Sequence, residues 1–162
     1  MRFVMVVLLL LSASLCFAQI EQIHAKVVNG NCTICFKTVQ VALQQEVNSI
    51  GDVKGDSTAQ TYDITFKAAT VPLKNLLTQL KAANPNGTVQ VQLTASGRVD
   101  VKQNQFVLAV PNQTETLWID AGTRIQSVMN FSQGGHTVRL SGDITQSNNG
   151  FKISLTRLQK ID

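Results

Sequence analysis

The stretch IHAKVVNGNCTICFKTVQVAL, residues 23–43, changes its periodicity once, and that change determines the fold prediction. At its start Ile23, Ala25 and Val27 alternate with more polar side chains, which is typical of a half-buried strand. After the turn residues 29–31, apolar side chains recur at helical spacing. The stretch therefore predicts a strand, a loop and then a helix.

The chain continues with the same two periodicities up to residue 94. Residues 50–54 and 62–66 read as strands, and residues 89–93 read as a further strand. Between them, leucines at helical spacing predict a helix over residues 73–80, with Thr70 as its cap. The order β-α-β-β-α-β predicts a ferredoxin-like domain over residues 19–94.

Beyond residue 94 the helical periodicity nearly disappears. Short strands are expected at residues 99–101, 106–110, 117–119, 137–144 and 151–158, with one helix at residues 123–131. This order is typical of a small OB-fold-like barrel over residues 95–162. The predicted fold class is thus α+β, a ferredoxin-like βαββαβ domain followed by an all-β OB-like barrel. The absence of a low-complexity linker predicts a tight junction at residues 93–98, or one continuous strand that serves both halves.

The first eighteen residues resemble a secretory signal peptide. Arg2 precedes a short apolar core, which is followed by the small residues 12–14 and closes with Cys16, Phe17 and Ala18. We expect cleavage after Ala18 and a secreted or periplasmic protein, with no membrane-spanning segment after cleavage. A lipid anchor on Cys16 is the less favoured alternative, because Leu15 lies where a small residue is usual.

The charge balance is mild. The chain has 14 basic and 10 acidic side chains, and removing residues 1–18 takes away one basic residue, Arg2, which leaves a net charge of +3. Nucleic-acid and anionic-membrane partners call for clustered lysine and arginine, whereas the surplus here is scattered. We therefore expect no nucleic-acid partner.

Cys32 and Cys35 form the motif with the clearest capacity for chemistry in this sequence. Cys32 falls in the predicted loop and Cys35 in the first helical turn, where the helix dipole favours the thiolate. Two thiolates at this spacing suit Cu(I) in near-linear coordination, or Zn(II) if other ligands complete the shell. The pair predicts one soft metal ion per chain.

With this motif after its first strand, the stretch from about residue 23 to residue 93 resembles the heavy-metal-associated domain family of metallochaperones. The loop of residues 30–35, the helix that follows it and the segment of residues 51–53 carry the resemblance. It implies that Cys32 and Cys35 are the ligands, and that the ion passes to a donor or acceptor protein by ligand exchange. The implied function is soft-metal binding and trafficking.

Other interpretations of the pair stay open. Export favours a disulfide between Cys32 and Cys35, and a degenerate domain would hold no ligand at all. In either case the chain is a structural, ligand-binding or protein-interaction module. A thioredoxin-like redox role is disfavoured because the pair lacks the usual flanking aromatic residue and internal proline. The chain contains no Ser/His/Asp set and no phosphate-binding loop, so we expect no enzyme activity.

The second half offers aromatic and soft side chains. These are Phe106, Trp118, Met129, Phe131, His136 and Phe151. They could stack on a sugar or a single strand, or bind a metal, but a small barrel needs most of its aromatic residues for the core. Structural roles are therefore the favoured interpretation, and both His24 and His136 are expected to be exposed or simply hydrogen-bonded.

Overall fold

The computed structural model describes residues 19–29, 40–41, 43, 49–67 and 70–161. Strands dominate this part of the chain. They are β1 (Gln19–Val28), β2 (Ile50–Asp56), β3 (Thr61–Phe66), β4 (Thr88–Lys102), β5 (Gln105–Ala109), β6 (Leu117–Asp120), β7 (Thr137–Ser147) and β8 (Gly150–Lys160). The helices are α2 (Leu73–Ala82), the short 3₁₀ turn η2 (Gly122–Arg124) and α3 (Ile125–Gly134).

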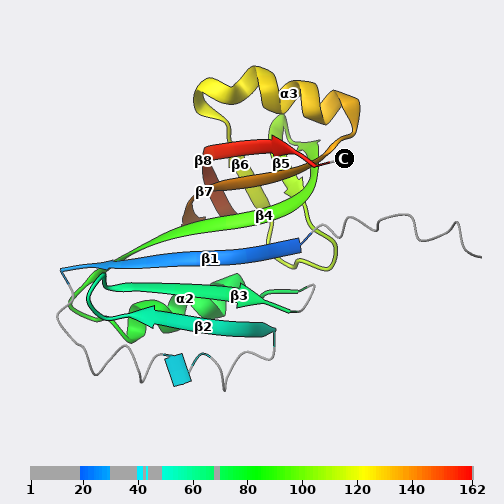
Figure 1. Ribbon diagram of the computed structural model, residues 1–162. Helices are drawn as coiled ribbons and strands as arrows, with labels where there is room; N and C mark the ends of the chain where they lie inside the picture. Colours follow the sequence, from blue (N-terminus) through cyan, green and yellow to red (C-terminus); the bar gives the residue numbers. More distant parts are fainter. Residues whose placement is uncertain (1–18, 30–39, 42, 44–48, 68–69, 162) are drawn as a thin grey trace, which may run out of the picture.

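All eight strands belong to one mixed sheet, in the order β2-β3-β1-β4-β5-β6-β8-β7. Neighbouring strands are antiparallel except β6 and β8, which are parallel. An additional pairing of β4 with β7 closes the five strands β4, β5, β6, β8 and β7 into a ring. Figure 1 shows α2 beside β2 and β3, and α3 at the other end of the sheet near β8.

The predicted fold class is wrong. The structure shows one large sheet with two short α-helices in its described part, and no ferredoxin-like domain followed by a separate barrel. The reason lies in β4, whose inward-facing Val91, Leu93, Ala95 and Val99 are all buried. These buried positions continue through residues 93–98, and a single strand pairs with both parts of the sheet.

Gly97 lies where β4 changes its partner along one edge. Residues 88–96 pair with β1 and residues 98–102 pair with β5, while the opposite edge pairs with β7. A Cβ atom at Gly97 would lie 2.5 Å from the backbone oxygen of Ala109. The close approach of the two backbones thus requires glycine at this position.

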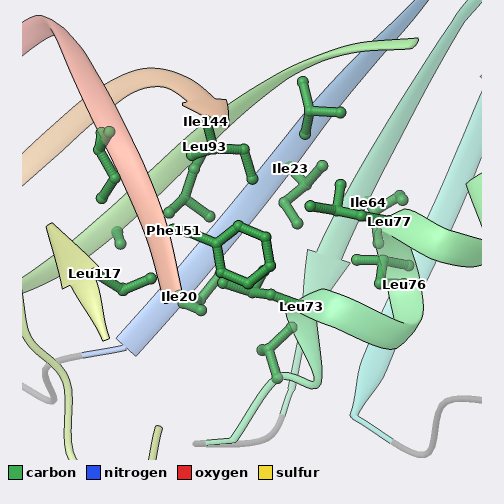
Figure 2. Packing of buried hydrophobic residues seen from close by; sticks show 14 of the residues in the cluster. Ile20, Ile23, Ile64, Leu73, Leu76, Leu77, Leu93, Leu117, Ile144 and Phe151 are labelled. Atoms are coloured by element: carbon green, nitrogen blue, oxygen red, sulfur yellow. The ribbon is translucent and has the colours of Figure 1, made fainter. Parts of the chain in front are cut away.

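A single hydrophobic cluster extends under the whole sheet. Helix α2 buries four leucines on one face, as their spacing predicts, namely Leu73, Leu76, Leu77 and Leu80. They belong to the same cluster as Ile20 of β1, Leu117 of β6 and Phe151 of β8. Figure 2 shows the ring of Phe151 within this cluster, together with side chains of α2 and of several strands. The core is therefore continuous from one end of the sheet to the other.

The predicted cap of α2 is wrong. Thr70 does not cap the helix, because its hydroxyl donates instead to the backbone oxygen of Asn112 at 3.1 Å. The backbone N–H of Lys74, in the first turn, donates to Glu115 Oε1 at 3.3 Å. A carboxylate from a distant loop thus takes the role that a local side chain usually has.

Candidate functional site

A cleft of about 810 Å³ opens beside the strands of the closed ring. It lies where the β4–β5 turn, strand β6 and the β7–β8 turn meet. Its lining combines aromatic and aliphatic side chains, amides and two charges. The lining residues are Gln103, Asn104, Gln105, Phe106, Trp118, Ile119, Asp120, Ala121, Gly122, Ile125, Ser147, Asn148, Asn149 and Lys152.

Both turns at the cleft have the backbone geometry of tight hairpins. Gln103 and Asn104 have φ values of 50° and 60°, and two consecutive positive values are typical of a type I′ turn. The β7–β8 turn ends at Gly150, which has a φ of 133° and lies close to the backbone of Thr116. These turns bring amide side chains to two sides of the cleft.

Trp118 is held in place by its neighbours on both sides. It pairs with Val107 of β5 and with Lys152 of β8. Val107 is itself buried. The indole Nε1–H donates to the backbone oxygen of Asn149 at 3.2 Å. Since its polar atom is already bonded, the half-buried indole can meet a ligand through its face.

Asp120 and Lys152 form an ion pair in the cleft, with 2.9 Å between Oδ2 and Nζ. Their side chains are 41% and 53% exposed, so both can reach a ligand. The hydrogen bond from Lys152, and then its positive charge, lower the pKa of Asp120, and a backbone hydrogen bond from Gly122 acts in the same direction. Asp120 is therefore a carboxylate at neutral pH.

The loop between β5 and β6 connects the cleft to helix α2. The side-chain amide of Gln113 accepts from the backbone N–H of Val71 at 3.2 Å and donates to its carbonyl at 2.7 Å. Glu115 binds the first turn of α2, as described above, and β6 begins two residues later at Leu117. These contacts tie the chain just before Trp118 to helix α2.

The sequence-predicted metal ligands Cys32 and Cys35 lie outside the described residues. Before them β1 ends at Val28, and after them residues 40, 41 and 43 are helical. Within the described ranges, no three histidine, cysteine or acidic side chains come together as a group that could hold a metal ion. Nor does any helix in these ranges have the length and apolarity needed to cross a membrane.

The histidines and aromatic residues take separate places. His24 lies on the exposed side of β1, with Nδ1 2.7 Å from Asp63 Oδ1. His136 meets the ring of Phe131 edge-on, with centroids 6.3 Å apart. Phe151 is part of the core, Phe106 packs against the core and also lines the cleft, and Trp118 lines the cleft. Of the aromatic residues named from the sequence, some therefore contribute to the core and others line the cleft.

Sequence reasoning missed the polar residues of the cleft. The sequence indicates only turns at Gln103, Asn104, Asn148 and Asn149. No motif marks Asp120 and Lys152 as binding residues. The one available signal was the tryptophan itself, because large aromatic residues often serve binding surfaces.

Comparison of the chain with protein-family models, with curated proteins and with solved structures gives no match.

Proposed function

We propose that the protein is a binding module whose cleft holds a polar ligand with a flat apolar face, stacked on Trp118. The observation that carries this proposal is the fixed, half-buried indole at the cleft, with its N–H already bonded to Asn149. Stacking on an aromatic ring does not require a particular hydrogen-bond pattern, and the surrounding amides supply donors and acceptors. The module needs no catalytic step.

Trp118 also supplies the test, because it is the single tryptophan of the chain. We expect a ligand in the cleft to change its fluorescence, and a Trp118→Ala variant to bind about 10–100-fold more weakly, since stacking contributes about 1–3 kcal/mol. Isothermal titration calorimetry measures both proteins. The probes are neutral oligosaccharides and single-stranded oligonucleotides.

The matched control is Phe131→Leu, which removes an aromatic ring of the same part of the molecule but outside the cleft lining. It should leave the affinity unchanged. If no probe alters the fluorescence of Trp118, or if Trp118→Ala and wild type bind a probe equally, the cleft is not the binding site.

A second candidate function is soft-metal binding and trafficking through Cys32 and Cys35, with Cu(I) or Zn(II) as the cargo. Its support is the spacing of the two cysteines and the resemblance of this region to heavy-metal-associated domains. Before the pair β1 ends at Val28, and after it residues 40, 41 and 43 are helical, with Leu43 buried. The predicted signal peptide would direct the protein to the periplasm or the cell exterior. There the protein would exchange the metal ion with a donor or acceptor protein.

Metal titration under reducing conditions tests this second function. We expect the chain without residues 1–18 to bind about one Cu(I) ion, because two thiolates suffice for near-linear coordination. The Cys32→Ser/Cys35→Ser double variant should lose that binding. Equal and negligible binding of Cu(I) and Zn(II) by both proteins would reject the metal function and leave the cleft function unaffected.

A further inference from the structure

Trp118, Asp120 and Lys152 lie on the same face of two adjacent strands. Lys152 is paired directly with Trp118 across the parallel β6–β8 ladder, and Asp120 is two residues further along β6. Neighbouring strands are about 4.8 Å apart, and two residues along a strand span about 6.6 Å. A single ring lying on the indole would therefore reach the ion pair with its edge.

Asp120 and Lys152 are the two charged side chains among the residues that line the cleft. Because they carry opposite charges, the cleft has no net charge with which to attract a polyanion. Proteins that bind single-stranded nucleic acids rely on a positively charged groove that follows the phosphates. The charge balance therefore favours a neutral ligand.

We infer that the Asp120–Lys152 pair recognises two neighbouring hydroxyl groups of a neutral saccharide whose ring stacks on Trp118. This inference rests on the proposed function of the cleft and names the ligand class for it. A hydroxyl is both donor and acceptor, whereas the carboxylate only accepts and the ammonium only donates. One hydroxyl of a vicinal diol donates to Asp120, and its neighbour accepts from Lys152, so both charges keep a partner.

The remaining cleft residues fit the same ligand class. Gln103 from one turn, Gln105 at the start of β5, and Asn148 and Asn149 from the other turn present amides that can donate to and accept from hydroxyls. Ligand sites in proteins usually measure about 300–1,000 Å³, and the cleft volume of about 810 Å³ lies in the upper part of that range. The cleft thus accommodates an oligosaccharide better than a single sugar.

The experiment titrates the protein with cellohexaose and with chitohexaose, and follows the fluorescence of Trp118. Interior rings of cellohexaose carry two neighbouring free hydroxyls, whereas an acetamido group replaces one of them in chitohexaose. We expect cellohexaose to bind at least about tenfold more tightly. Asp120→Asn and Lys152→Gln should each weaken cellohexaose binding about 10–100-fold, because hydrogen bonds to charged groups are the stronger ones.

Both variants retain Trp118 as the reporter, and Asp120→Asn keeps an oxygen that can accept from the backbone N–H of Gly122. The matched control is Asp52→Asn, which removes a carboxylate whose oxygen lies 3.9 Å from Lys54 Nζ on β2, away from the cleft. It should leave binding unchanged. Thermal unfolding of each variant verifies that the fold is intact.

The possible outcomes separate the inference from the function on which it rests. Equal binding of the two sugars, or cellohexaose binding that is unaffected in both cleft variants, overturns the diol inference and leaves the cleft function standing. A response to an oligouridylate instead of the sugars overturns the saccharide class alone. Unchanged fluorescence of Trp118 with every probe overturns both.

Discussion

Replacing Phe151 with alanine should lower the free energy of unfolding by about 3–5 kcal/mol. The side chain is 1% exposed and belongs to the cluster that joins α2 to the strands (Figure 2). Its truncation removes apolar contacts and leaves a cavity. The strands of the closed ring cannot readily shift to fill this cavity, because they are paired on both edges. Urea denaturation, followed by circular dichroism, measures the change.

The control for this variant is Gln159→Ala, an exposed position on the same strand. It should change the free energy of unfolding by less than about 0.5 kcal/mol. If Phe151→Ala costs less than about 1 kcal/mol, the core is not continuous through Phe151 in the way described. Binding should also weaken in Phe151→Ala, because the next residue is Lys152 of the cleft.

A second large loss of stability is expected for Gly97→Ala, of about 2–4 kcal/mol. The added methyl group would lie 2.5 Å from the backbone oxygen of Ala109 and 3.1 Å from Leu108 Cγ. Backbone cannot move aside as a flexible side chain can, so β4 and β5 must separate locally. The same denaturation experiment measures the loss.

Gly51→Ala is the matched control, because Gly51 also lies in a strand but has room for a methyl group. Its nearest neighbour would be the backbone oxygen of Thr65 at 3.4 Å. We expect this variant to be as stable as the wild type or slightly more stable, since alanine reduces the entropy of the unfolded chain. Equal losses in the two variants would show that close packing at Gly97 is not the cause.

The elements of this chain could be predicted better than their connection. The leucine spacing of α2 and the alternation in β1 and β3 are local signals, and the structure has a helix and strands at those places. The sequence leaves open whether residues 93–98 form a tight junction or one continuous strand, and in the structure Ala95, Ser96 and Gly97 are all buried within β4. Whether small residues end a strand or allow a close approach depends on partners far along the chain.

The cleft could not be predicted for a related reason. Trp118 and Lys152 become neighbours only through the parallel register of β6 and β8, and that register follows from closure of the ring. Asp120 alone looks like an ordinary polar residue at a strand end, and only its pairing with Lys152 gives it a chemical role. The cysteine pair shows the opposite case, because its motif is visible in the sequence and lies outside the described residues.

The sharing of β4 has a consequence for how this protein can be recombined. Because residues 88–96 complete the pairing of β1 while residues 92–102 close the ring, the first half has no last strand of its own and the second half has no first strand of its own. A chimera that borrows the cleft must carry residues 92–102 of β4, and it then exposes the edge of β4 that β1 now covers, which favours aggregation. Moving the cleft to another protein therefore requires a new strand in place of β1.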